Sequence, residues 1–171
     1  LSVKLSKKAL LAACVAAALP AVAGAQTKIY GTMDVFAGQQ KTDAGSKMLV
    51  DSGGFTTSYW GMSGGEDLGG GLKALFAIEG FLRADGGATG RFTGDATYAR
   101  SAYVGVGGGF GTVTLGRNTA PYFLSTIIFN PFADSFAFSP MVFHTFLGTG
   151  VNYTQVNGDT GLSNSVRWQS P

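Results

Sequence analysis

The stretch GGEDLGGGLKALFAIEGF, residues 64–81, joins a glycine-rich segment to a run in which apolar side chains recur at every second position. Alternate residues form an apolar set of Leu72, Ala74, Phe76 and Ile78 and a second set of Lys73, Ala77 and Glu79, with Leu75 as an exception. A period of two is typical of a β-strand whose two faces meet different surroundings. The stretch therefore predicts a tight turn followed by a two-faced strand.

The same alternation recurs along the chain, and no long segment shows a helical period. Residues 28–38 alternate in this way. In residues 98–106 the alternation places Arg100 on the side opposite Ser101 and Tyr103. Further strands are expected at residues 56–64, 110–117 and 163–169. Several runs approach the roughly 9 to 11 residues of a tilted transmembrane strand, so we expect an all-β chain.

The expected connections alternate between long and short. Residues 39–55 and 82–96 are long, whereas residues 64–71 and 107–111 are short and rich in glycine. Transmembrane antiparallel β-barrels of the outer membrane have short periplasmic turns and longer external loops. A soluble β-sandwich also alternates polar and apolar faces, so alternation alone does not separate the two folds. The loop rhythm and an export signal favour the barrel.

That export signal occupies residues 1–25. Lys4, Lys7 and Lys8 precede an alanine-rich apolar run that ends in small residues, which is typical of a cleaved secretory signal. We expect cleavage after Ala25. The run is broken by Pro20 and is short for a transmembrane helix. A lipoprotein cleavage box ending at Cys14 is a weaker alternative, because it would leave the better cleavage site unused.

Composition without the signal excludes several classes of protein. The net charge falls from +2 to −1, since three lysines leave nine basic residues against ten acidic ones, and no basic surface for nucleic acid follows. Removal of Cys14, the only cysteine, excludes disulfide and thiolate chemistry. His144 is the only histidine and by itself predicts no metal site. We therefore expect no cofactor and no metal.

Three segments, SYWGMSGGEDLGGGLKALFAIEGF (58–81), YARSAYVGVGGGFGTVTLGRNTAPY (98–122) and SNSVRWQSP (163–171), resemble the Gram-negative trimeric porins in order and spacing. Residues 29–38, IYGTMDVFAG, resemble the first strand of that family. The resemblance implies a sixteen-strand outer-membrane barrel, assembled as a homotrimer, through which small hydrophilic solutes and ions diffuse passively. It implies a channel and not an enzyme.

The resemblance also implies particular site residues. A loop at residues 118–160 would fold inward and narrow the pore. Arg100 matches a wall arginine of the family, and Arg117, Arg167 and Asp134 are expected at the same constriction. Pore-lining positions are expected at Asp34, Tyr59, Lys73 and Glu79. The loop has few acids and many phenylalanines, and Tyr59 and Ser63 stand where the family usually has basic residues. We therefore expect a more apolar and less polarised constriction than is usual in the family.

The chain ends at Pro171 after about six expected strands, whereas single-chain barrels begin at about eight. We expect the N-terminal portion of a longer porin, or a truncated product. The alternative is a complete eight-strand barrel, acting as an adhesin or structural protein without a pore, which would recruit residues 122–129 and 143–153 as strands.

A hydrolase ranks third. Residues 61–65 match a nucleophile elbow around Ser63, with Asp134 and His144 after it in the hydrolase order. The elbow needs a helix directly after the serine, and a glycine-rich turn stands there instead.

Overall fold

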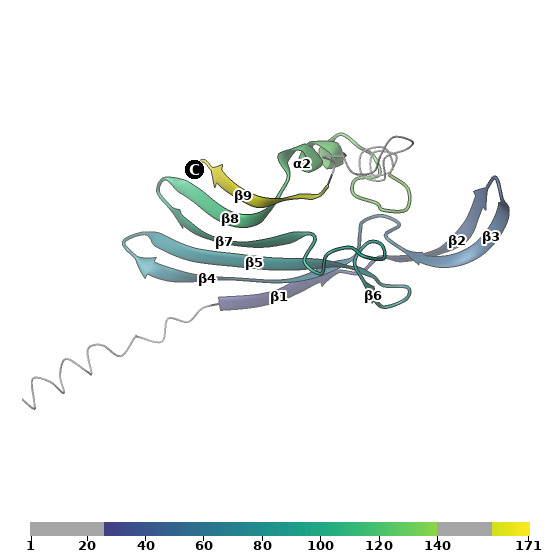
Figure 1. Ribbon diagram of the computed structural model, residues 1–171, viewed down its shortest axis with the longest axis horizontal. Helices are drawn as coiled ribbons and strands as arrows, with labels where there is room; N and C mark the ends of the chain where they lie inside the picture. Colours follow the sequence, from purple (N-terminus) through teal and green to yellow (C-terminus); the bar gives the residue numbers. More distant parts are fainter. Residues whose placement is uncertain (1–25, 140–158) are drawn as a thin grey trace, which may run out of the picture.

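The computed structural model describes residues 26–139 and 159–171, and these residues form mainly antiparallel sheet. A seven-stranded sheet has the order β1 (Gln26–Thr32), β4 (Tyr59–Gly69), β5 (Leu72–Arg83), β7 (Ser101–Gly108), β8 (Gly111–Thr119) and β9 (Gly161–Gln169), with the short β6 (Ala88–Thr89) paired to β5 (Figure 1). The expected all-β class is confirmed. The predicted signal lies outside the described residues.

Tight glycine turns join the strands at one end of the sheet. Gly69, Gly70 and Gly71 all have positive φ, a conformation that only glycine adopts at little cost, and Asp67 Oδ1 accepts a hydrogen bond of 2.8 Å from the Gly69 N–H. Glu66 and Asp67, which the sequence analysis placed in the turn, lie instead within β4. Long connections lie at the opposite end of the sheet (Figure 1).

The expected long loop at residues 39–55 is wrong, because most of it is a second hairpin. It consists of β2 (Val35–Thr42) and β3 (Gly45–Ser52), which extend beyond one end of the main sheet (Figure 1). The expected strand at residues 28–38 is also divided, since Met33 and Asp34 separate β1 from β2. The physical reason is Asp34, whose carboxylate accepts hydrogen bonds from the N–H groups of Gly54 and Phe55 instead of leaving the chain extended.

The register confirms the two faces expected for β5. Tyr30, Gly61, Glu79 and Ser101 lie opposite one another across four strands, and so do Ile29, Met62, Ile78 and Ala102. We call the side that carries Tyr30, Lys73, Glu79 and Arg167 the polar face, and the side that carries Ile29, Ile78, Val104, Leu115 and Val166 the apolar face. Leu75 belongs to the polar face, as its exceptional place in the pattern indicated.

Burial is inverted relative to a water-soluble sheet protein. On the apolar face Ile29 is 79% exposed and Val166 71% exposed, whereas Ser101 on the polar face is 2% exposed. Buried positions among the described residues are mostly polar, including Ser58, Thr114 and Asn118. Large apolar side chains normally supply the core of a soluble domain. This sheet instead presents them outward.

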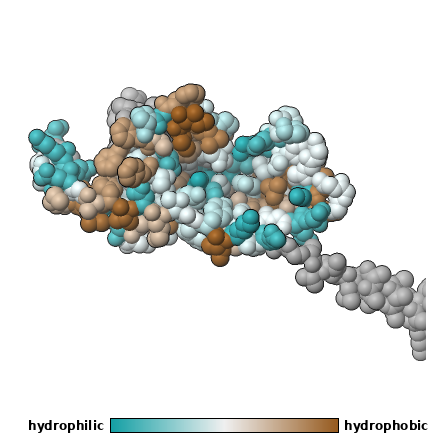
Figure 2. Space-filling model, turned by 180° about the vertical axis from the view of Figure 1, so that it is seen from behind, coloured by the Kyte–Doolittle hydropathy of each residue, from teal (hydrophilic) through white to brown (hydrophobic). Residues whose placement is uncertain are grey.

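One short helix, α2 (Pro121–Ile128), follows β8 and lies across the loop end near β9 (Figure 1). Its first turn begins with Pro121, which has no N–H to lose. Figure 2 shows apolar side chains open on the surface in this region. No described helix is long and apolar enough to cross a membrane. The eight-strand alternative needs a strand at residues 122–129, and this expectation is wrong because α2 occupies most of that segment. The other segment that this alternative needs, 143–153, lies outside the described residues.

Candidate functional site

Four residues of the polar face form a cluster that we call the wall cluster: Tyr30, Tyr59, Glu79 and Arg100. The Tyr30 hydroxyl donates a hydrogen bond of 2.8 Å to Glu79 Oε1, and Arg100 Nη1 lies 3.6 Å from Glu79 Oε2. The Arg100 guanidinium also lies 3.9 Å from the centre of the Tyr59 ring, at a distance typical of a cation–π contact. Three of the residues were expected in the pore from the sequence, and Tyr30 was missed as a site residue.

Local sequence explains how this cluster fits together. Gly61 lies between Tyr30 and Glu79 in the register, and a Cβ at this position would lie 2.8 Å from Glu79 Cγ. The glycine therefore leaves room for the tyrosine and the carboxylate to meet across β4.

The expectation that Arg100 lies opposite Ser101 and Tyr103 is wrong. The strand β7 begins only at Ser101, and the Arg100 N–H donates a hydrogen bond to the Glu79 carbonyl. Strict alternation does not apply outside a strand. The guanidinium of Arg100 therefore reaches the same face as Glu79, which pairs with Ser101.

Two further predicted residues line the polar face nearer the glycine turns. Lys73 lies opposite Asp67 and lines a pocket of about 610 Å³ together with Lys28. Arg167 lies opposite Thr114, and its Nη2 donates a hydrogen bond of 3.1 Å to Gln169 Oε1. Both residues are therefore near solvent-accessible space on the expected pore side, but neither contacts the wall cluster through a hydrogen bond or ion pair found among the described residues.

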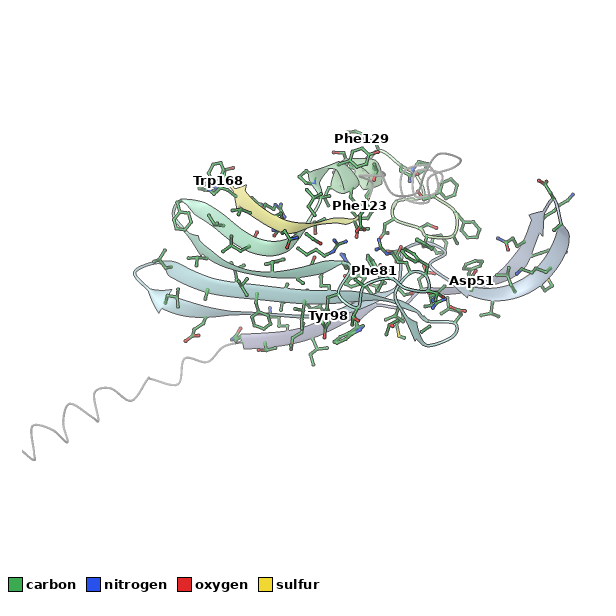
Figure 3. The ribbon with its side chains drawn as sticks, viewed as in Figure 1. Asp51, Phe81, Tyr98, Phe123, Phe129 and Trp168 are labelled. Atoms are coloured by element: carbon green, nitrogen blue, oxygen red, sulfur yellow. The ribbon has the colours of Figure 1, made fainter. Side chains whose placement is uncertain are left out.

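A second charged cluster joins the loops, and we call it the loop network: Arg91, Asp95, Arg117 and Asp159. Arg91 forms hydrogen bonds to both carboxylate oxygens of Asp95, at 2.7 and 2.9 Å, and its Nη1 lies 3.0 Å from Asp159 Oδ1. The guanidinium also lies 4.6 Å from the centre of the Phe81 ring, which is labelled in Figure 3. The side chains of Arg91 and Asp95 are 3% and 5% exposed.

Arg117, expected at the constriction, belongs to this network. Its Nη2 pairs with Asp159 Oδ2, and its Nη1 donates a hydrogen bond of 2.8 Å to Ser163 Oγ. Its charge is thus matched by a carboxylate that also pairs with Arg91. The spacing of Arg91 and Asp95, four residues apart in a polar loop, is the sequence signal that could have suggested the pair.

The two loop carboxylates have lowered pKa values. Burial by itself raises the pKa of Asp95, but hydrogen bonds from Arg91 and its charge outweigh that effect, and the resulting pKa lies below the ordinary 3.8. Burial likewise raises the pKa of Asp159, and the hydrogen bond from Arg117 with the charges of Arg91 and Arg117 outweighs it. Both carboxylates therefore remain ionised at neutral pH.

Asp134 and Asp34 hold loops in place. Asp134 Oδ1 accepts a hydrogen bond of 2.7 Å from Thr56 Oγ1, and its carbonyl accepts one from Thr57 Oγ1. Asp34 accepts hydrogen bonds from the backbone of residues 54–56. Among the described residues, Asp134 forms no ion pair with a wall arginine. The segment after α2 is thereby fastened to the loop that follows the β2–β3 hairpin.

No group of three or more His, Cys, Asp or Glu side chains in the described part of the chain lies close enough to hold an ion.

An antiparallel sheet with an outward apolar face and a charged, partly covered polar face defines the wall of an outer-membrane β-barrel. The chain belongs to the Gram-negative porin family, whose model matches residues 9–171. Membership of this family supports the expected outer-membrane location and the porin interpretation over the hydrolase.

The relatives cover parts of this chain. Outer membrane porin protein 32 of Delftia acidovorans is 37% identical over 118 residues, which are 67% of this chain and 32% of that protein. Major outer membrane protein P.IB of Neisseria gonorrhoeae is 33% identical over 122 residues, which are 67% of this chain and 33% of that protein. The chain thus spans about a third of the length of the curated relatives it matches.

A solved structure supports the same fold. An anion-selective porin from Comamonas acidovorans superposes with a TM-score of 0.67 at 29% identity, covering 86% of this chain and 43% of that one. The β-barrel class expected from the sequence is confirmed, and the strands described here form part of such a barrel without closing it.

Proposed function

We propose that this chain forms part of the wall of a water-filled channel through which small hydrophilic solutes and ions diffuse passively, in a homotrimer in the outer membrane. The observation that carries the proposal is the inversion of burial: apolar side chains face outward, and the wall cluster lies on the opposite face. Charged residues are costly against lipid, so a charged face needs water beside it.

Arg100 is the proposed cation of the constriction. Its guanidinium is held by Tyr59 and by Glu79 on the polar face, so the positive charge has a defined position. The proposed inward loop is residues 118–160, and α2 with the segment fastened by Asp134 makes up most of its described part. Asp134 is then an anchor of the loop and Glu79 is the acid of the constriction.

The polar face favours anions. Its strands carry Lys28, Lys73, Arg83 and Arg167, with Arg100 just before β7, against Asp67 and Glu79. Fixed charges lining a pore select ions of the opposite sign. The solved relative is described as an anion-selective porin, which agrees with a preference for anions here.

The test is to express the complete reading frame, purify the folded protein and record its conductance in planar lipid bilayers. We expect stepwise, salt-dependent conductance and a reversal potential of the sign that indicates anion preference in a KCl gradient. Lys41→Gln, which removes one positive charge from the exposed β2–β3 hairpin, is the control and should behave as the unmodified protein. Folded protein that inserts without conducting would overturn the proposal.

A further inference from the structure

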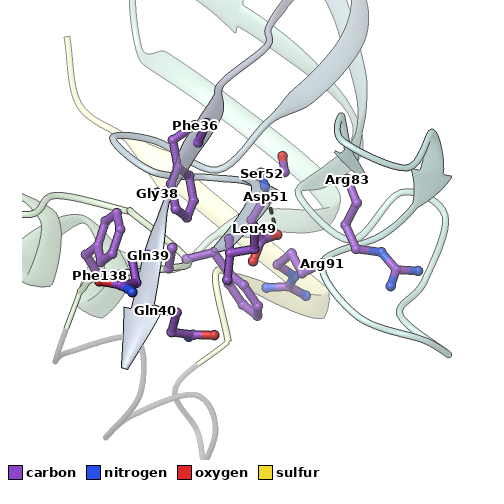
Figure 4. A pocket seen from close by; sticks show the side chains of 13 residues that line it. Phe36, Gly38, Gln39, Gln40, Leu49, Asp51, Ser52, Arg83, Arg91 and Phe138 are labelled. Carbon is purple, nitrogen blue, oxygen red and sulfur yellow. Dashed lines mark hydrogen bonds between the residues drawn. The ribbon is translucent and has the colours of Figure 1, made fainter. Parts of the chain in front are cut away.

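A pocket of about 480 Å³ lies at the loop end of the sheet, away from the wall cluster. It is bounded by the inner side of the β2–β3 hairpin, by residues 136–138 and by the ends of the strand and loop that carry Arg83 and Arg91 (Figure 4). Pockets of about 300–1,000 Å³ are typical of small-molecule sites. The volume therefore suits a ligand of the size of an amino acid.

The walls of this pocket are held by hydrogen bonds between segments far apart in the sequence. Ser135 Oγ donates a hydrogen bond of 3.0 Å to the Gly53 carbonyl, which fastens the segment of Phe138 to the hairpin base. Ser52 Oγ accepts one of 3.1 Å from the Ala84 N–H, which holds the end of β5 beside β3. The pocket is therefore largely formed before any ligand enters.

One side of the pocket is apolar. The rings of Phe36 and Phe138 lie with their centres 5.0 Å apart at an interplanar angle of 52°, and Leu49 lies beside them (Figure 4). The absence of a side chain at Gly54 makes this possible, because a Cβ there would lie 2.9 Å from the Phe36 ring. This side can receive an aromatic or branched aliphatic group.

The pocket is also lined by two residues of opposite charge that do not form an ion pair with each other. Arg83 and Asp51 both line the pocket, and neither takes part in an ion pair among the described residues. The Nε atom of Arg83 is buried without a hydrogen-bond partner in the described part of the chain. Arg91, in contrast, is already paired with Asp95 and Asp159. A ligand carboxylate that pairs with the Arg83 guanidinium would form a charge-assisted contact that no ion pair among the described residues supplies.

We propose that this pocket binds a small zwitterion with an apolar side chain, such as an aromatic or branched amino acid. The carboxylate of the ligand accepts hydrogen bonds from Arg83, its ammonium pairs with Asp51, and its side chain lies against Phe36, Leu49 and Phe138. Arg83 belongs to the polar face by its place along β5, so the site is on the channel side of the barrel wall. It would collect such solutes ahead of the wall cluster. Binding itself does not depend on conduction.

The test measures binding and not transport. The detergent-solubilised protein is titrated by calorimetry with L-phenylalanine, with 3-phenylpropionate, which lacks the ammonium, and with phenethylamine, which lacks the carboxylate. We expect saturable binding of phenylalanine and at least about tenfold weaker binding of each analogue, because each loses one charge-assisted contact. Equal binding of phenylalanine and both analogues, or no saturable binding of phenylalanine, would overturn the proposal.

Variants assign the two contacts. Arg83→Gln should remove the preference for phenylalanine over phenethylamine, and Asp51→Asn should remove the preference over phenylpropionate. Lys41→Gln changes one charge on the same hairpin without lining the pocket and should change neither preference. If Arg83→Gln fails to fold, the exposed Asp51→Asn still tests the proposal, and preferences that survive it would overturn the assignment. Ligand binding without conductance would contradict only the channel, and conductance without ligand binding only this site.

Discussion

The two charged clusters of this chain contain the same kinds of groups under opposite conditions. In the loop network the Arg91 side chain is 3% exposed and lies 2.7 Å from Asp95, whereas in the wall cluster the Arg100 side chain is 26% exposed and lies 3.6 Å from Glu79. A buried, closely paired arginine is strongly coupled to its partner, and a looser, partly hydrated one can still act on a passing ion. The comparison indicates that the loop network holds structure and the wall cluster faces solute.

The same comparison separates two arginines that look equivalent in sequence. Arg100 and Arg117 both match positions of the family, yet Arg117 pairs with Asp159 in the loop network while Arg100 is held against an aromatic ring and a carboxylate on the polar face. The assignment of a structural role to the loop network and a solute-facing role to the wall cluster can be tested by substitutions in each cluster. It would be contradicted if the two clusters had the same effects on stability and selectivity, or the reverse of those expected.

The largest change in the free energy of unfolding is expected from Arg91→Met. The substitution leaves the buried Asp95 carboxylate without its charged partner, and breaking a buried ion pair in this way typically costs about 3–5 kcal/mol. The measurement is the free energy of unfolding by urea in lipid vesicles or micelles. Lys41→Met on the exposed hairpin is the control and should leave stability nearly unchanged. A loss from Arg91→Met no greater than that of the control would refute a structural role for the loop network.

Acid should weaken the loop network over a defined range of pH. The pKa values of Asp95 and Asp159 are lowered in the folded protein from the ordinary 3.8, so the unfolded chain binds protons first as the pH falls. The stabilisation from these carboxylates is therefore fully present above pH 3.8 and is lost as the pH falls through the lowered pKa values. Asp95 should contribute the larger share, because its side chain is 5% exposed whereas that of Asp159 is 39% exposed and better screened by water.

Unfolding by urea at a series of pH values between neutrality and strong acid measures this loss. Asp95→Asn should reduce the acid-dependent part of the stability, since one of the two titrating groups is gone. A pH dependence equal to that of the unmodified protein would exclude Asp95 as its source.

Arg100→Ala should change the free energy less than Arg91→Met does, but it should specifically change the ion selectivity of the channel. Arg100→Ala removes a positive charge from the polar face and leaves the Glu79 charge without its arginine. Ion preference should therefore shift toward cations, roughly fivefold in permeability ratio for about 1 kcal/mol of Coulomb energy in water. Arg117→Ala should shift it less, because that arginine is engaged with Asp159. The reversal potential under a salt gradient measures both variants. An equal shift in the two would contradict the division between the clusters.

The smallest effect on ion selectivity is expected from Tyr30→Phe. It removes the hydrogen bond to Glu79 Oε1 but leaves the ring and the Arg100 contact, and one such bond contributes about 1 kcal/mol. Urea unfolding should show a loss of this order with little change in reversal potential. A selectivity change as large as that of Arg100→Ala would mean that Tyr30 itself sets the charge of the site.

Much of the sheet could be predicted because the pattern that encodes it is local. The alternation in residues 72–81 places Lys73 and Glu79 on one face of β5, and the register confirms this. The strands expected at 110–117 and 163–169 correspond to β8 and β9 within two residues at each end. The β2–β3 hairpin was missed because Asp34 interrupts the pattern, and its bonds to residues 54–56 are not visible in sequence.

The candidate site could be predicted only in part. Tyr59, Glu79 and Arg100 do meet, since two lie on neighbouring strands and the third directly precedes β7. The role expected for Asp134 as an acid opposite the wall arginines remains a prediction, and its carboxylate is engaged with Thr56. Nothing in the sequence indicated that Arg91 would meet Asp159, which is 68 residues further along the chain.

The sequence by itself determined the two faces of the sheet and the glycine turns between its strands, because side-chain direction in a strand and positive φ at glycine are properties of neighbouring residues. Only the tertiary structure decided which charges are paired, which carboxylates anchor loops and where Arg83 and Asp51 border a common pocket. Those outcomes depend on strand register and on the paths of loops distant in sequence, and these bring charges together irrespective of their separation along the chain.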